Sequence, residues 1–193
     1  MLGKLRKYIN EYLPKTLGNF FAKAGLTAND ATLIGFLFAI LAPILAYFKI
    51  YYGIPVVILL SGFMDIIDGA IARATSKTSR FGAYLDSLTD RLSDMLFFLA
   101  LALSGVNAFI AIIALGLSEI VSYSRSKGEL IGVKMEGIGL LERSERLLLL
   151  FIVSILLIFR QVLISNIIVS IIALFGAITI YQRSSKVLSS LKN

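Results

Sequence analysis

The sequence predicts an all-α integral membrane protein with six transmembrane helices and an N-terminal amphipathic helix at the membrane interface. Its 193 residues are 58% hydrophobic and only 16% charged, whereas soluble domains contain about 45–50% apolar residues. The mean hydropathy is +0.86. Six apolar segments follow a basic N-terminal stretch. We therefore expect one membrane domain over residues 1–193, with an interfacial helix at 1–25 and a six-helix bundle at 26–193.

The N-terminal stretch has the pattern of a helix that lies on a membrane surface. Leu2, Leu5, Ile9 and Leu13 recur at helical spacing, and basic residues lie between them. Such a pattern favours binding to anionic lipid headgroups. A frayed basic tail is the alternative. The stretch lacks the uninterrupted apolar region and small-residue cleavage site of a signal peptide.

Each apolar segment is long enough to be a membrane helix or most of one. The first follows Thr27-Ala28-Asn29-Asp30, which is rich in N-cap residues, and the second begins with Pro55, which suits a first helical turn. The third ends at Ser104-Gly105. The segments span about 31–48, 55–73, 81–103, 108–125, 146–159 and 164–181.

The basic residues predict the orientation of the bundle. Seventeen of the nineteen Lys and Arg residues fall on one side of these segments, and only Lys49 and Arg160 fall on the other. The positive-inside rule makes the basic side cytoplasmic. We expect a multi-pass protein of the cell membrane with both termini and its active site inside. This distribution indicates that the net charge of +7 reflects membrane orientation rather than nucleic-acid binding.

The second and third segments contain five carboxylates that are costly to place among membrane helices. Asp65 and Asp68 are three residues apart, and Asp86, Asp90 and Asp94 follow at steps of four, so each set lies on one helix face. The short connection between the segments predicts an antiparallel hairpin. Both acidic faces can therefore meet near the cytoplasmic side.

These carboxylates predict a metal site. Clustered carboxylates repel one another unless a cation intervenes. The chain has no histidine or cysteine, and oxygen ligands suit Mg²⁺ or Mn²⁺. Structural ion pairs with Arg73, Arg80 and Arg91 are the alternative, but three basic groups do not cover five acids.

Eight residues of this region stand at fixed spacing: Asp65, Asp68, Gly69, Ala72, Arg73, Gly82, Asp86 and Asp90. They resemble, at every defined position, the motif DxxDGxxARx(8)GxxxDxxxD of the CDP-alcohol phosphotransferase family. The six segments and the interfacial helix extend the resemblance over the whole chain. Members of this family move a phosphoryl-linked group from a CDP-activated donor to an alcohol.

The resemblance implies that Asp65, Asp68, Asp86 and Asp90 hold two divalent metal ions, Mg²⁺ or Mn²⁺, that clamp the donor pyrophosphate. It also implies that Asp90 is the general base for the acceptor hydroxyl. Asp94 lies outside the motif, and we expect it to support the ligands.

The resemblance also implies a set of contacts to the CDP donor. Gly69 and Gly82 would let the cytidine approach the helix backbones, although either glycine could instead serve helix packing. Arg73 would contact donor phosphate, or its side chain would extend to the membrane interface. The family often has Pro where this chain has Ala28, so the polar residues there either contact the donor or cap the helix. The implied donor residues are Asn29, Thr32, Gly69, Ala72, Arg73, Thr78, Ser79 and Gly82.

A second basic region predicts the acceptor. Residues 123–134 and 142–146 concentrate basic side chains on the side of the carboxylates, which suggests an acceptor with its own phosphate. A loop that only sets topology is the alternative. The region resembles the phosphatidylinositol phosphate synthase branch and its archaeal relatives. This chain has Lys127 where that branch usually has Arg. The lysine keeps the positive charge but lacks the two parallel N–H donors of a guanidinium. The implied acceptor-phosphate ligands are Arg125, Lys127, Arg143 and Arg183.

The expected reaction joins a CDP-linked lipid, CDP-diacylglycerol or CDP-archaeol, to inositol 1-phosphate and releases CMP. Five alternatives remain open. Glycerol 3-phosphate or serine could be the acceptor, or CDP-inositol could be the donor and give a soluble product. A divalent-cation transporter and a non-catalytic scaffold are alternatives from other classes. The resemblance also implies a homodimer.

Overall fold

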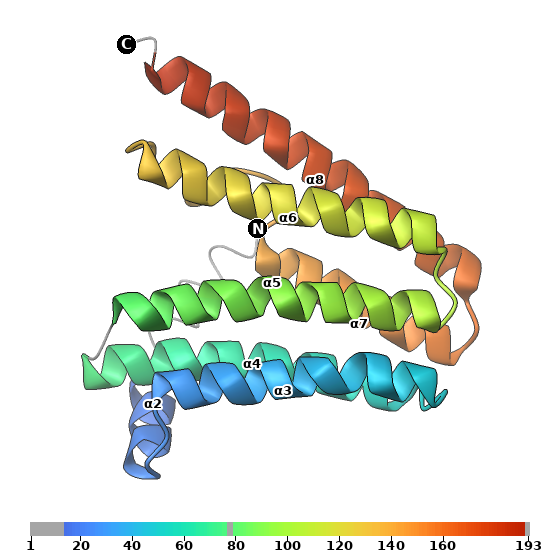
Figure 1. Ribbon diagram of the computed structural model, residues 1–193, viewed down its shortest axis with the longest axis horizontal. Coiled ribbons are helices and arrows are strands. Elements are labelled where there is room, and N and C mark those ends of the chain that lie inside the picture. Colours follow the sequence, from blue (N-terminus) through green and yellow to red (C-terminus); the bar gives the residue numbers. More distant parts are fainter. Residues whose placement is uncertain (1–13, 77–78, 192–193) are drawn as a thin grey trace. The chain divides into compact units, whose positions relative to one another are not determined.

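The structure, a computed structural model, describes residues 14–76 and 79–191, which form seven helices and no strand. It confirms the all-α fold class (Figure 1). The chain divides into two compact units, residues 1–100 and 101–193, and each is described by itself. The helices are α2 (Pro14–Lys23), α3 (Ala28–Tyr47), α4 (Gly53–Thr75), α5 (Arg80–Leu103), α6 (Ala108–Leu130), α7 (Arg143–Ile158) and α8 (Val162–Leu191).

Every predicted apolar segment lies in a helix, from α3 to α8. The boundaries differ where polar residues continue a helix, because backbone hydrogen bonding does not end where hydropathy falls. Thus α6 continues to Leu130 and α8 to Leu191. The N-terminal boundary of α3 has a different cause: the helix begins at Ala28 because Thr27 forms a capping box with Asp30.

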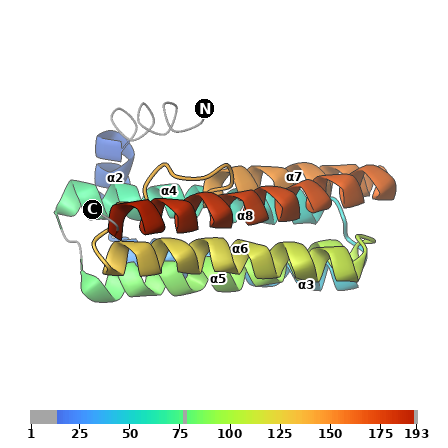
Figure 2. The same cartoon turned by 90° about the horizontal axis from the view of Figure 1, so that it is seen from above.

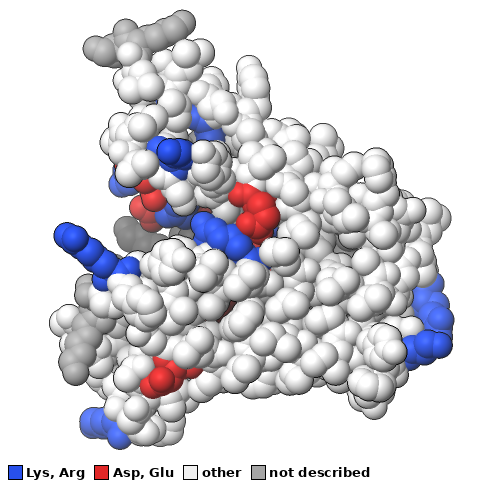
Figure 3. Space-filling model, in the orientation of Figure 1, with Lys and Arg blue, Asp and Glu red and all other residues white. Residues whose placement is uncertain are grey.

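Four of the described helices, α3, α4, α6 and α8, are long and apolar enough to cross a membrane. Helix α7 has only 16 residues, and α5 carries several charged side chains along its length. Large uncharged surfaces surround the few charged side chains in Figure 3. The described helices support an integral membrane protein, and six crossings stay a prediction.

Helices α3 and α4 of the first unit lie side by side and run antiparallel (Figures 1 and 2). A Cβ on Gly35 would lie 3.0 Å from the Met64 Cβ and 3.4 Å from the Ser61 carbonyl oxygen. Small residues let membrane helices approach this closely. The close approach fixes the acidic part of α4 against α3. The side chains that α3 buries are Ala31, Thr32, Gly35, Ala39, Ala42 and Ala46.

Helix α2 packs across the C-terminal half of α4. A Cβ on Gly18 would lie 2.3 Å from the Ala70 carbonyl oxygen, so the two backbones are nearly in contact. Leu17 and Phe21 pack on a core cluster formed by Ala31, Ile67 and Ile71. The apolar residues on which the interfacial helix was predicted, Leu2, Leu5, Ile9 and Leu13, lie outside the described residues.

In the second unit, α6 and α8 run side by side in the same direction, and α7 also packs on α8 (Figures 1 and 2). The buried residues of α8 recur every three or four positions, which is the spacing of a helix–helix seam. A Cβ on Gly176 would lie 3.2 Å from the Leu117 Cβ. The buried positions of α8 are Ser165, Val169, Ile172, Gly176, Thr179 and Arg183.

The close contact at Gly18 gives a first prediction. Gly18→Ala should destabilise the protein by about 1–3 kcal/mol, because the new methyl group overlaps a backbone oxygen that cannot move freely. Gly116→Ala is the matched control, since nothing lies within 4 Å of its Cβ position and alanine favours a helix. Thermal unfolding in detergent measures both. Equal midpoints for the two variants would contradict the packing of α2 on α4.

Candidate active site

The carboxyl group of Asp68 is held by a hydrogen bond from the neighbouring helix. The Thr32 hydroxyl donates to the Asp68 Oδ2 at 2.8 Å and also lies 3.0 Å from the Ala28 carbonyl oxygen. Because a hydroxyl has one proton, it serves one of these acceptors at a time. Both side chains are buried, with 5% of Thr32 and 8% of Asp68 exposed. This bond ties α3 to the acidic face of α4.

Motif carboxylates of α4 and α5 approach one another around Asp68. Asp65 and Asp86 both interact electrostatically with Asp68, as the predicted hairpin requires. Asp65, Asp86 and Asp90 are half-buried. Within the described part of the chain, no three acidic side chains surround one point closely enough to hold an ion as they stand. The oxygen-only donor set fits Mg²⁺ or Mn²⁺, and the four-ligand assignment stays a prediction.

The start of α5 brings together three of the predicted donor residues. Ser79 caps this helix, because its Oγ accepts the N–H of Gly82 at 2.8 Å. A Cβ on Gly82 would lie 3.0 Å from both the Asn29 Oδ1 and the Ser79 Oγ. Gly82 therefore leaves room for these polar atoms. Thr78 lies outside the described residues.

The capping alternative for the start of α3 is wrong. Thr27 is the N-cap, and its side chain accepts the N–H of Asp30 at 3.2 Å. Neither Asn29 nor Thr32 fills that role, since both lie inside the helix. Thr32 instead faces Asp68, and Asn29 faces Gly82.

Arg73 folds back over Gly69 on the preceding turn of α4. A Cβ on Gly69 would lie 3.1 Å from the Arg73 Nη1. Arg73 is exposed, and Gly69 and Ala72 are half-buried. Gly69 thus provides a bare helix face, and the guanidinium of Arg73 occupies it in this structure.

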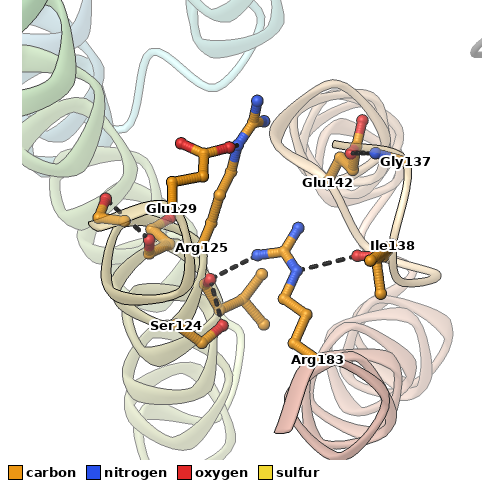
Figure 4. A network of polar contacts seen from close by, with 10 residues as sticks. Ser124, Arg125, Glu129, Gly137, Ile138, Glu142 and Arg183 are labelled. Carbon is orange, nitrogen blue, oxygen red and sulfur yellow. Dashed lines mark hydrogen bonds and ion pairs between the residues drawn. The ribbon is translucent and has the colours of Figure 1, made fainter. Parts of the chain in front are cut away.

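In the second unit, Arg183 is buried and bridges two other elements (Figure 4). Its Nε donates to the Ile138 carbonyl oxygen at 2.9 Å, and its Nη1 donates to the Val121 carbonyl oxygen at 2.6 Å. Only 2% of the residue is exposed. Ile138 belongs to the loop between α6 and α7, residues 131–142. Arg183 therefore links α8 to α6 and to this loop.

A mixed charged cluster surrounds Arg183. Arg125 pairs with Glu129 at 3.0 Å, and both side chains are partly exposed. Arg125, Arg146, Glu129 and Glu142 all interact electrostatically with Arg183. Of the predicted acceptor ligands, the structure thus brings Arg125 and Arg183 together.

The other two predicted ligands, Lys127 and Arg143, lie on α6 and at the start of α7. Lys127 is exposed on α6, and Arg143 is half-buried as the first residue of α7. The sequence interpretation missed Arg146, which is 2% exposed. Its position on the buried face of α7 is visible in the sequence only through its spacing of four and seven residues from Leu150 and Val153.

Comparison with known proteins identifies a family. Residues 25–180 match the family model described as CDP-alcohol phosphatidyltransferase. The chain is 38% identical to an archaetidylinositol phosphate synthase of Pyrococcus horikoshii over 95% of this chain and 94% of that protein. It is 34% identical to a phosphatidylinositol phosphate synthase of Streptomyces avermitilis over 77% of this chain and 66% of that protein.

Solved structures agree with these matches. The fold is similar to crystal structures of a Mycobacterium tuberculosis phosphatidylinositol phosphate synthase at 25% sequence identity. The complex of that enzyme with manganese and citrate has a TM-score of 0.78 and covers 91% of this chain and 88% of the enzyme. The complex with CDP-DAG has a TM-score of 0.77 and covers 90% and 92%.

The hydrogen bond from Thr32 to Asp68 predicts an effect on metal binding. Thr32→Val keeps the shape of the side chain but removes the donor, so Asp68 loses its orienting partner. We expect about tenfold weaker Mn²⁺ binding, the usual size of an effect from a group behind a metal ligand. Thr32→Ser, which retains the hydroxyl, is the control. Titration of substrate-free protein followed by electron paramagnetic resonance gives both affinities, and wild-type affinity in Thr32→Val would refute the role.

Proposed function

Because this chain belongs to the CDP-alcohol phosphatidyltransferase family, we propose that it transfers the phosphatidyl-type group of a CDP-linked lipid to inositol 1-phosphate and releases CMP. The observation that carries the proposal is the complete Asp65-to-Asp90 motif in a chain 38% identical, over nearly its whole length, to an archaetidylinositol phosphate synthase. The donor is CDP-archaeol or CDP-diacylglycerol, since relatives of both kinds are similar to this chain.

The metal ligands in this proposal are Asp65, Asp68, Asp86 and Asp90, which would hold two Mg²⁺ or Mn²⁺ ions. The electrostatic contact of Asp68 with Asp65 and Asp86 supports this set. So does the manganese in the complex of the mycobacterial enzyme. When bound, such ions stabilise the charge that develops on phosphate oxygens during the transfer.

The protein's own residues would then direct a displacement at phosphorus. Asp90 accepts the proton of the acceptor hydroxyl as the oxygen forms a bond to the lipid-bearing phosphorus. The bond from that phosphorus to the bridging pyrophosphate oxygen breaks, and CMP leaves with the electron pair. No other residue type in the motif can take the proton, because the chain has no histidine.

The donor contacts are proposed around the same helices. Asn29 and Ser79 present polar atoms beside the bare backbone of Gly82, where a cytidine could approach. Arg73 is exposed, so its guanidinium can leave Gly69 for a donor phosphate. Thr32, Ala72 and Thr78 complete the donor set by resemblance to the family motif.

The acceptor phosphate is proposed to bind in the second unit. Arg125 and Arg183 lie in one charged cluster, and the surplus of arginine there favours an anion. Lys127 and Arg143 would approach the same phosphate. The acidic Glu129 and Glu142 are neighbours that can orient the guanidinium groups or accept inositol hydroxyls.

The remaining assignments follow from the sequence and from the family. We propose six crossings of the cell membrane, with both termini and the active site on the cytoplasmic side. The positions of Lys49 and Arg160 in helix–helix turns support this orientation, because each turn lies at the end of its hairpin away from the basic loops. We also propose that the whole chain is one membrane domain and that it forms a homodimer.

The release of CMP from purified protein tests the function. The assay contains Mg²⁺, inositol 1-phosphate and one of the two CDP-lipids, and the wild type should release CMP under these conditions. The Asp90→Asn variant should release CMP at least about 100-fold more slowly, because it lacks the general base. Glu136→Gln, an exposed carboxylate outside the motif, is the matched control. Release that requires glycerol 3-phosphate or serine would retain the chemistry and reject the acceptor. Release from CDP-inositol alone would reject the lipid donor.

A lysine variant tests the proposed acceptor-phosphate ligands. Lys127→Met should raise the KM for inositol 1-phosphate by about tenfold and leave the KM for the CDP-lipid unchanged, because it removes one charged hydrogen bond to the phosphate. Lys186→Met is the control, since Lys186 is an exposed lysine on α8 outside the cluster. Steady-state kinetics with each substrate varied in turn separates the two constants. Equal KM values for inositol 1-phosphate in both variants would exclude Lys127 from the acceptor-phosphate ligands.

A further inference from the structure

Two side chains of α8, one helical turn apart, hold the α6–α7 loop. The Thr179 Oγ accepts the backbone N–H groups of Leu140 at 3.0 Å and Leu141 at 3.1 Å. Four residues later, the Arg183 Nε donates to the Ile138 carbonyl oxygen at 2.9 Å. One side chain accepts and the other donates, so the segment 138–141 is fixed in place and in register along α8.

The shape of the loop matches this contact. Gly139 has a φ of +124°, which L side chains rarely adopt, and a Cβ there would lie 2.3 Å from the Thr179 Cγ2. The loop backbone therefore rests directly on Thr179. Thr179 itself is fully buried, so its hydroxyl has no access to water that could replace the two amides.

The anchored segment leads directly into α7. Glu142 precedes the helix without capping it, and its Oε1 accepts the N–H of Gly137 at 3.2 Å, which closes the loop on itself. Arg143 is the first residue of α7. Its position therefore depends on where residues 138–141 are held on α8.

From this arrangement we infer that Thr179 is a positioning residue for the acceptor site, an inference that rests on the proposed function. Its hydroxyl sets the place of Arg143 through Leu140 and Leu141. It also stabilises the loop carbonyl to which Arg183 donates. Thr179 contacts neither substrate in this scheme. Replacing a purely structural threonine would lower stability and raise the KM of both substrates alike, whereas replacing a positioning residue raises the KM of the acceptor selectively.

Kinetics of two variants test the inference. Thr179→Val keeps the shape but presents a methyl group to both amides, and Thr179→Ser keeps the hydroxyl. We expect Thr179→Val to raise the KM for inositol 1-phosphate about tenfold, with kcat and the KM for the CDP-lipid within about twofold of wild type. Thr179→Ser should restore the acceptor KM. An unchanged acceptor KM, or an equal rise in the KM of both substrates, would overturn the inference.

Hydrogen–deuterium exchange gives a readout that does not depend on activity. The amides of Leu140 and Leu141 should exchange faster in Thr179→Val than in the wild type and Thr179→Ser, and equal exchange in all three proteins would overturn the anchoring. If the wild type uses another phosphorylated acceptor, the proposed acceptor fails by itself. The KM for that acceptor then decides the role of Thr179.

Discussion

A charged group among membrane helices must be satisfied from within the protein, because lipid cannot solvate it. Each unit of this chain contains a buried charged residue of this kind that the sequence analysis had selected as a site residue. In the first unit, the buried Asp68 carboxyl receives the hydroxyl of Thr32 from the neighbouring helix. In the second, the buried Arg183 guanidinium donates to two backbone carbonyl oxygens. Neighbouring elements are placed by the need to supply these partners.

The packing around each charged group follows from the same constraint. Thr32 can reach Asp68 only because α3 presents small residues such as Ala31 and Gly35 to α4, which brings the helices close together. Arg183 can reach Ile138 only because the loop backbone passes over Thr179 at Gly139. Small apolar residues and glycines therefore determine where the Asp68 and Arg183 side chains lie.

In the function proposed above, the two units have separate chemical tasks. The first unit carries the acidic motif, which is suited to metal ions and to a nucleotide donor. The second carries an arginine-rich cluster, which is suited to an acceptor with its own phosphate. Such a division lets a family keep its donor chemistry while the acceptor changes, because changes in the loop and α8 leave the Asp65-to-Asp90 motif intact.

The sequence by itself determined the helical fold, the family and the acidic motif. Hydropathy and helical spacing are local properties, and a motif with fixed spacing on one helical hairpin needs no distant contact to be recognised. Each of the six apolar segments is accordingly helical, with errors mainly where a polar stretch continues a helix, as residues 182–191 continue α8. The close approach of Asp68 to Asp86 follows from the short α4–α5 connection and was predicted for that reason.

Only the tertiary structure decided which polar residues support the site. Thr27 rather than Asn29 or Thr32 caps α3, because several residues there have capping side chains and the backbone selects one. Thr32 and Asp68 are 36 positions apart, and Thr179 and Leu141 are 38 apart, so no local pattern links either pair. Arg183 was predicted as a phosphate ligand, but its bonds to backbone carbonyls depend on a loop fold that composition and spacing do not encode. Hydrogen bonds between distant segments form only when packing brings the segments together. Sequence patterns are local, so they could not predict these hydrogen bonds.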